Sequence, residues 1–173
     1  MSFNNLRGRL KTRFPILYDM HVEHKTKREY KKRVAICNES PKKLVKYVFN
    51  DIIHSEHKLN LDNPVTFHEK INWLKLHWYD ERAIVCSDKY RVREYVKLKG
   101  LDFLLNELYG VYDRAEDINL SKLPEKFILK ATHDSGHNVI RNGKENFNFK
   151  LAKRKLNWWL QIDYAYMSGE WPY

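Results

Sequence analysis

KFILKATHDSGHNVIR, residues 126–141, is the most informative stretch of this chain. An apolar run leads to Lys130, a polar loop with one glycine follows, and a second apolar pair precedes the Asn-Gly turn at 142–143. This pattern predicts two short antiparallel strands joined by a loop, with a lysine ending the first strand. Such a unit can clamp a nucleotide triphosphate, because loop N–H groups approach the phosphates and the ammonium neutralises their charge. The alternative is an ordinary β-hairpin whose Lys130 and His133 face water, since one Gly and one Lys make a weak phosphate signature.

A second segment strengthens the phosphate interpretation. SDKYRVREYV, residues 87–96, opens with a capping residue and continues with apolar side chains at helical spacing, and Gly100 ends it. We expect one helix here, with Asp88 as its N-cap and Lys89 in its first turn. Two more blocks stand on either side: NPVTFHEKINWLK at 63–75 and EWPY at 170–173.

The order of these four blocks resembles the teichuronopeptide-biosynthesis-like (TupA-like) ATP-grasp family. Its members are often labelled glycosyltransferases or polysaccharide biosynthesis proteins. The resemblance covers about residues 60–173, and four ordered blocks are far more specific than any one of them. It implies an ATP-grasp fold, in which ATP lies between two α+β subdomains. It also implies that a complete relative activates a carboxylate as an acyl phosphate and joins it to an amine.

The resemblance further implies which residues bind ATP. In ATP-grasp proteins one lysine follows an aspartate at the start of a helix, and a second ends a strand just before the phosphate loop. Lys89 and Lys130 match these two positions, so both are expected to contact phosphates. The loop at 132–138 matches the mobile phosphate flap, whose expected ATP contacts are His133, Ser135, Gly136 and Asn138. Its single glycine departs from many ATP-grasp loops. No catalytic residue is assigned.

An ATP-grasp domain normally continues beyond the EWPY block into the adenine hinge and the residues that bind magnesium. This chain stops at Tyr173. We therefore expect an α+β protein with a helix-rich N-terminal region, followed by the first part of an ATP-grasp domain and truncated before the second half. The expected parts are a basic helical region at 1–60, helices and a strand at 61–125, and a partial nucleotide-binding subdomain at 126–173. Magnesium prefers oxygen ligands, so we expect Mg²⁺ only if the missing half is supplied, and weak or no ligase activity.

Composition indicates a folded protein with a basic N-terminal segment. Hydrophobic residues make up 43% and aromatic residues 14% of the chain, enough for a core. There is no signal-like or membrane-spanning apolar run, and two cysteines suggest neither zinc nor disulfides. We therefore expect a cytoplasmic protein that can also make peripheral contact with the inner membrane face.

Charge is concentrated at the start of the chain. Residues 1–46 hold 13 Lys/Arg and 4 Asp/Glu, whereas residues 47–173 hold 19 and 18. The basic segment suits an anionic glycan or an anionic membrane surface, and a merely solvated extension is the alternative. Nucleic acid is disfavoured, because the tryptophans do not interleave with the basic residues as a stacking platform would.

Periodicity predicts further elements. One helix is expected from Pro41, with a buried stripe of Leu44, Val45, Val48, Phe49, Ile52 and Ile53. A capping box of Thr66 and Glu69 starts another that ends near Tyr79, with a buried face of Phe67, Ile71, Leu74 and Trp78. Residues 104–112 have strand-like stretches. A helix is expected over 149–166, with inward side chains at Leu151, Leu156, Trp159, Leu160 and Ile162.

Other chemistry is sparse. His133 and His137 are four residues apart, but the glycine between them argues against a shared helical face and a metal pair. Cys86 reads as a core thiol without a base beside it. Two other functions compete with the ligase: a glycosyltransferase, which the lack of an Asp-x-Asp motif disfavours, and a non-catalytic interaction module with a basic docking surface.

Overall fold

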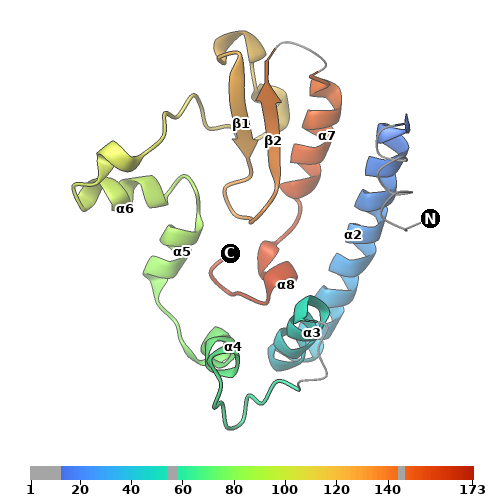
Figure 1. Ribbon diagram of the computed structural model, residues 1–173, viewed down its shortest axis with the longest axis vertical. Helices are drawn as coiled ribbons and strands as arrows, with labels where there is room; N and C mark the ends of the chain where they lie inside the picture. The colour runs from blue at the N-terminus through green and yellow to red at the C-terminus, as the bar shows by residue number, and fades with distance from the viewer. Residues whose placement is uncertain (1–12, 54–57, 144–146) are drawn as a thin grey trace.

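The computed structural model describes residues 13–53, 58–143 and 147–173. It is an α+β protein with one small antiparallel sheet, several short helices and one long helix, α2, along one side (Figure 1). The elements follow the order α2 (Pro15–Glu39), α3 (Pro41–Ile53), α4 (Phe67–His77), α5 (Glu81–Ser87), α6 (Val92–Leu98), the 3-10 turns η1 (Asp102–Leu104), η2 (Ala115–Asp117) and η3 (Leu120–Lys122), β1 (Lys126–Lys130), β2 (Asn138–Asn142), α7 (Phe149–Trp159) and α8 (Tyr164–Ser168).

Helices α2 and α3 are joined at Ser40 and pack against each other. Proline at the first position of each helix fits a helix start, because its missing N–H is unsatisfied there in any case. The predicted stripe of α3 is buried at Leu44, Val45, Val48 and Phe49. Ile52 was expected to be inward but is exposed, since it lies in the last turn beyond the packing surface, and the side chain of Ile53 is outside the described residues.

Helix α4 begins at the predicted capping box. The Thr66 side chain accepts the N–H of Glu69, and the Glu69 carboxylate accepts the N–H of Thr66 at 2.9 Å. The same carboxylate accepts the N–H groups of Val65 at 3.0 Å and Asn60 at 3.2 Å. Glu69 is therefore buried although it is charged, because backbone donors replace the water that its carboxylate loses.

The predicted buried face of α4 is wrong. Phe67 is 72% exposed, and the exposed set also includes Ile71, Leu74 and Trp78. The helix instead turns Trp73 and Leu76 toward the core beneath α3. The capping carboxylate explains this rotation, since burying Glu69 beside the preceding chain turns the Phe67–Ile71 side outward.

The helix expected from Lys89, with Asp88 as its N-cap, begins three residues later, at Val92. Helix α5 ends at Ser87, a turn follows, and α6 begins at Val92. Asp88 caps this turn by accepting the N–H groups of Tyr90 and Arg91, both at 2.8 Å. Cys86 is exposed rather than in the core, because so short a helix has no fully buried face. The strand-like residues 104–112 form no strand among the described residues; η1 and an extended segment replace it.

The sheet and α7 build the upper core. Strands β1 and β2 pair antiparallel, as predicted, and the structure places Ile128 opposite Ile140. Their inner face packs with η2 and α7 through a buried set of Ala115, Ile118, Val139, Ala152 and Leu156. The single helix expected over 149–166 is two: α7 stops at Trp159 and α8 starts at Tyr164, with Asp163 as its N-cap. Leu160 lies in this break and is exposed, against expectation, whereas Ile162 is buried.

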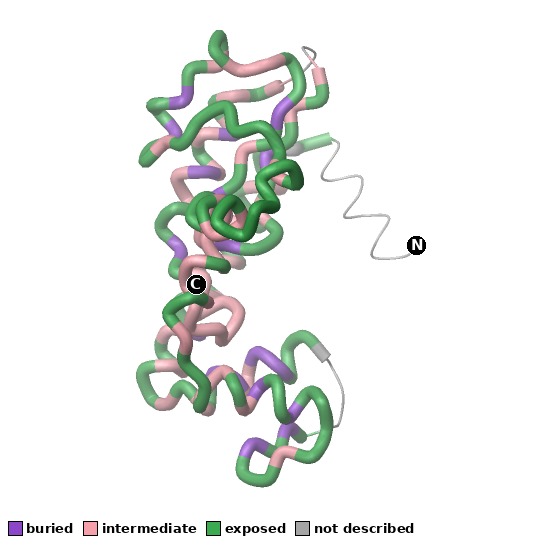
Figure 2. Tube along the Cα trace, turned by 90° about the vertical axis from the view of Figure 1, so that its left-hand side faces the viewer, coloured by how far each residue is buried: buried purple, intermediate pink, exposed green. Residues whose placement is uncertain are grey.

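A second core lies at the opposite end of the molecule, where α3 meets Leu59, Leu61 and α4. The structure is elongated, and its C-terminus lies midway along it (Figure 2). The final block reaches back to α4: Glu170 pairs with Lys75 at 3.3 Å, and the Trp171 ring lies 5.8 Å from that of Trp78. The core around α3 contains residues from both sides of the expected boundary near 60. The core between the sheet and α7 contains residues from both sides of the expected boundary near 125. The three-part division stays a proposal. Among the described residues no helix is long and apolar enough to span a membrane.

Candidate functional site

Lys130 ends β1 on the outer face of the sheet. Side chains alternate along a strand, so Lys126, Ile128 and Lys130 share the face opposite the core, and all three are exposed. The side chain of Lys130 makes no hydrogen bond or ion pair with any other described residue, although its backbone is paired with that of β2. Its ammonium is therefore available to a ligand.

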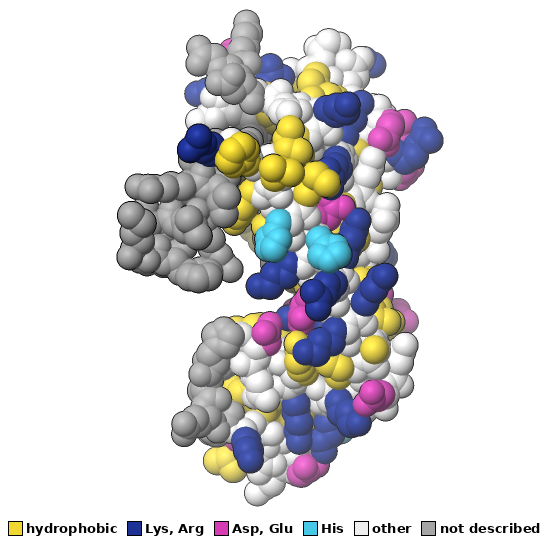
Figure 3. All heavy atoms as spheres, turned by 90° about the vertical axis from the view of Figure 1, so that its right-hand side faces the viewer, with side chains coloured by type: hydrophobic (Ala, Val, Ile, Leu, Met, Phe, Trp, Pro, Cys, Tyr) yellow, Lys and Arg dark blue, Asp and Glu magenta, His cyan; other side chains and the backbone are white. Residues whose placement is uncertain are grey.

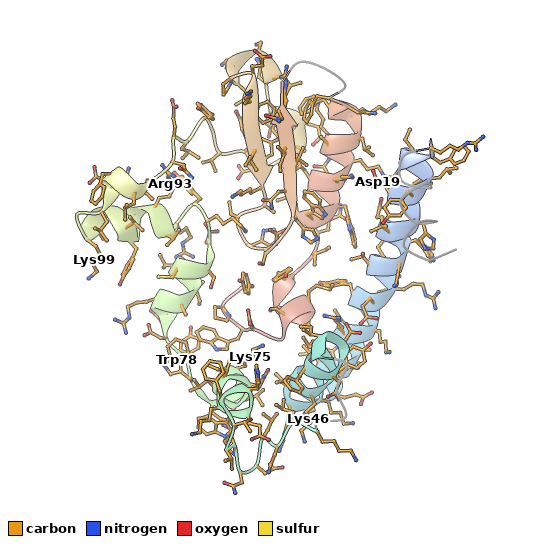
Figure 4. All side chains as sticks on the ribbon, viewed as in Figure 1. Asp19, Lys46, Lys75, Trp78, Arg93 and Lys99 are labelled. Atoms are coloured by element: carbon orange, nitrogen blue, oxygen red, sulfur yellow. The ribbon has the colours of Figure 1, made fainter. Side chains whose placement is uncertain are left out.

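A cavity of about 690 Å³ opens beside this strand. It lies between β1, the start of α6, the extended residues 106–112 and the end of α7. Its cations are Lys89, Arg93, Arg114 and Lys130, and Glu107 is its carboxylate. Apolar surface comes from Leu108, Val111, Ile128 and Leu129, among others. Figure 4 shows Arg93 on the part of α6 nearer the sheet, whereas Lys99 lies at the outer end. The cavity thus combines an apolar wall with excess positive charge.

Lys89 lines this cavity, but its ammonium is bonded to other groups of the protein. Its ammonium donates to the carbonyl oxygens of Ala131 at 2.9 Å, Thr132 at 3.4 Å and Asp134. It also pairs with the Asp134 carboxylate at 3.2 Å. An ammonium has three N–H donors, so these four acceptors saturate it. The backbone N–H of Lys89 adds a bond to Thr132 O at 3.0 Å. Lys89 therefore holds the start of the loop after β1.

Asp134 is the buried centre of this arrangement. Asp134 is 3% exposed, and its second carboxylate oxygen lies 2.7 Å from Nδ1 of His137. A carboxylate only accepts, so Nδ1 of His137 holds the proton. The imidazole also stacks on Trp159, with ring centroids 4.8 Å apart. One carboxylate thus fastens both ends of the loop.

A family model describing TupA-like ATP-grasp proteins matches residues 69–173. The chain belongs to the TupA-like ATP-grasp family. The match covers the turn of Lys89, the hairpin of Lys130 and the final block. No curated protein and no solved structure matches this chain significantly. In this TupA-like protein the predicted nucleotide residues divide into two sets.

Lys89 and Lys130, the two lysines, line the same cavity. The four loop residues lie elsewhere. His133 donates from Nε2 to Ile162 O at 3.0 Å, and Gly136 has φ +88°, which suits glycine. Asn138 lies beside a second cavity of about 470 Å³, between α2, β2 and α7.

Ser135 lies against the C-terminal aromatics. It makes side-chain hydrogen bonds with Tyr164 and Tyr173, whose pKa values burial raises while these bonds oppose the rise. The phenol rings of the two tyrosines meet edge to face at 5.0 Å. Because Ser135, Asp134 and His133 each have a protein partner, the loop is fastened along its length rather than held as an open flap.

The cavity suits a nucleotide polyphosphate better than its magnesium. Lys130, Arg93 and Arg114 keep donors for phosphate oxygens, and Ile128 offers an apolar surface two residues from Lys130 on the same strand face. Magnesium prefers several oxygen ligands, but within the described part of the chain Glu107 is the one acidic side chain that lines the cavity. Across the described residues, no group of three His, Cys, Asp or Glu side chains is placed to hold a metal.

Sequence reasoning missed Arg93, Arg114 and the central role of Asp134. Arg93 follows Lys89 by four residues, so the one-turn spacing of the helix predicted from the sequence could have suggested it, although Lys89 lies in the turn before α6. Arg114 had no such signal, because the connector that contains it has no periodicity. Asp134 has no local signal beyond its place in the polar loop, because nothing in the neighbouring sequence shows that Lys89 will reach it.

Proposed function

We propose that this chain binds ATP in the cavity between β1, α6 and residues 106–112. The observation that supports this function is the shared cavity of Lys89 and Lys130, the two lysines that match the ATP-grasp phosphate positions. The nucleotide-binding part would serve an ATP-dependent carboxylate–amine ligase of cell-surface or capsular polysaccharide biosynthesis. In such a reaction ATP activates the carboxylate as an acyl phosphate, which the amine then attacks.

The two lysines have different tasks in this proposal. Lys130 has no protein partner among the described residues and supplies the free ammonium to the phosphates. Lys89 positions the loop from beneath, and Arg93 and Arg114 add positive charge at the cavity wall. Arg93 gives one N–H to Asn106 O at 2.9 Å, and Arg114 pairs with Asp117 at 3.0 Å, so both keep other donors. The base would lie against Ile128 and its apolar neighbours.

We further propose that residues 1–173 alone bind ATP weakly and show little or no ligase turnover. Phosphoryl transfer needs electrostatic stabilisation of the phosphate oxygens, which bound magnesium commonly provides. The cavity has one carboxylate for that ion. An affinity on the order of millimolar, or about 4 kcal/mol of binding free energy, is expected from cations and apolar contact alone.

The test compares two lysines of one strand. Titration calorimetry would measure ATP affinity with magnesium present, for the wild type, Lys130→Ala and the matched control Lys126→Ala. Lys126 shares the strand face of Lys130 but lies outside the cavity lining. We expect Lys130→Ala to weaken ATP binding by about tenfold, the loss of one charge-assisted contact, and Lys126→Ala to leave it unchanged.

ADP release would be measured beside the calorimetry. Equal losses in the two variants would mean that Lys130 acts through general charge, and the cavity assignment would then fail. Micromolar ATP binding with steady ADP release that Lys130→Ala abolishes would contradict the weak-binding part of the proposal.

A further inference from the structure

The side of α2 that faces away from α3 and α8 presents one continuous surface. Residues three or four apart in a helix share a face, and six exposed side chains follow this spacing. We call them the outer stripe of α2: Leu17, Met20, His21, His24, Arg28 and Lys31. No described element covers the stripe, because α2 meets α3, α7 and α8 through residues on its other side: Asp19, Glu23, Tyr30 and Arg33.

The first end of the stripe is apolar. Leu17 is 63% exposed, and the neighbouring exposed side chains are Phe14, Ile16 and Met20. The guanidinium of Arg13 lies 5.8 Å from the Phe14 ring. In Figure 3 hydrophobic side chains gather at the upper end of this face, with histidines and then Lys and Arg below them. Contiguous exposed apolar side chains of this kind mark a binding surface.

The other end of the stripe is cationic. Lys25, Arg28 and Lys31 are exposed, and none has a carboxylate within ion-pair distance among the described residues. The inner side of α2 is the opposite case. There Lys27 pairs with Glu23 at 2.6 Å, and Arg33 pairs with Glu29 at 2.9 Å. The intramolecular pairs therefore leave the positive charge of α2 on its outer face.

We propose that the outer stripe of α2 docks on an anionic membrane surface. A helix with an apolar patch beside Lys and Arg lies in the interface, with apolar side chains at the acyl boundary and cations among the lipid headgroups. The charge complementarity is strong, since residues 1–46 hold 13 Lys/Arg and 4 Asp/Glu. A soluble acidic glycan would match the cations but would leave Leu17 and Met20 in water. This surface is independent of the ATP cavity, so neither proposal depends on the other.

Point substitutions test this surface better than removal of the segment, because Arg33 of α2 also contacts Asp51 of α3 and Met167 of α8. The full chain would be sedimented with vesicles of phosphatidylcholine alone and with vesicles that also contain phosphatidylglycerol. We expect binding to the anionic vesicles that falls as salt rises, since exposed charges are screened over about 10 Å at 0.1 M salt.

Two double variants separate the parts of the stripe. Arg28→Glu with Lys31→Glu should lower partitioning by at least about tenfold, since each basic residue contributes near the surface. Leu17→Ser with Met20→Ser should lower it by about tenfold with every charge retained. The matched control is Lys97→Glu with Lys99→Glu on α6, far from α2 (Figures 1 and 4), and it should bind as the wild type does. Circular dichroism would confirm that each variant is folded.

Three results would overturn the proposal. One is no binding to anionic vesicles at low salt. Another is an equal loss in the α6 control, which would show that only net charge matters. The third is unchanged vesicle binding by the Leu17→Ser, Met20→Ser variant together with equal binding to a soluble acidic polysaccharide, which would indicate a polyanion site instead.

Discussion

The ammonium of Lys89 lies 3.2 Å from the carboxylate of Asp134, a residue 45 positions further along the chain. The side chain of Asp134 is almost completely buried, whereas about a third of the Lys89 side chain is exposed. The pair joins the turn before α6 to the loop after β1. A lysine expected only to contact phosphate therefore also maintains the shape of the site.

Because of this contact, we expect Lys89 and Lys130 to contribute differently to the free energy of unfolding. Lys89→Met would leave the buried Asp134 carboxylate with His137 alone, so we expect a loss of about 2–3 kcal/mol in the free energy of unfolding. The expected loss is smaller than that for a fully buried ion pair, because the Lys89 ammonium is partly exposed to water. Lys130→Met should change stability by less than about 0.5 kcal/mol, as surface substitutions do. Urea unfolding measures both, and equal effects in the two variants would contradict the structural role of Lys89.

Acid should weaken the start of α4. Backbone N–H groups of Thr66 and Val65 lower the pKa of Glu69 to about 2, below its value of about 4.3 in an unfolded chain. The folded form thus prefers the ionised carboxylate. Its contribution is complete above the unfolded pKa and disappears as the pH falls from about 4.5 toward about 2. Unfolding measured across this range should show less pH dependence for Glu69→Gln than for the wild type, and identical slopes would exclude this role.

Arg33 should be a stability residue and not a docking residue. Its buried guanidinium bonds Glu29 at 2.9 Å, Asp51 at 2.7 Å and the carbonyl of Met167, and so ties α2, α3 and α8 together. We expect Arg33→Met to cost about 2–3 kcal/mol, because three acceptors lose their donor. Arg28→Met, on the exposed side of the same helix, is the control and should be near neutral. Thermal unfolding of both variants would measure these effects, and equal losses for Arg33→Met and Arg28→Met would contradict the stability role of Arg33.

The two thiols should react at different rates. Cys86 is exposed, and Cys37 is half-buried. Burial, with a smaller contribution from Asp163, raises the pKa of Cys37. The thiolate is the reactive form, so Cys86 should react first with a disulfide reagent at neutral pH and Cys37 more slowly. Cys86→Ser should remove the fast phase. A fast phase that persists in this variant would contradict the assignment.

Several parts of the fold were predictable from the sequence because they depend on neighbouring residues. The apolar runs around the loop predicted the β1–β2 hairpin, and the spacing of Thr66 and Glu69 predicted a capping box. The stripe from Leu44 to Phe49 likewise predicted the inner face of α3. The order of four blocks indicated the family that the family model confirms for residues 69–173.

Other predictions failed where polar capping groups outweighed the apolar pattern. The apolar positions of α4 suggested Phe67 and Ile71 as core, but the buried Glu69 carboxylate turns that side to solvent. Residues 149–166 have helical periodicity throughout, yet Asp163 caps a new helix after the break. In the candidate site, the matching of Lys89 and Lys130 came from the sequence, whereas Arg114 entered only through the fold.

The sequence by itself determined the β1–β2 hairpin, the capping box of α4, the buried stripe of α3, the place of Lys130 at the end of β1, and the family. These properties follow from side-chain spacing over a few residues, which the chain contains directly. The tertiary structure alone decided that Lys89 is saturated by the loop while Lys130 stays open to the cavity, and that the outer stripe of α2 is left uncovered. The physical reason is that a hydrogen-bond donor binds whichever acceptor the fold brings within reach. For Lys89 that acceptor is 45 residues away.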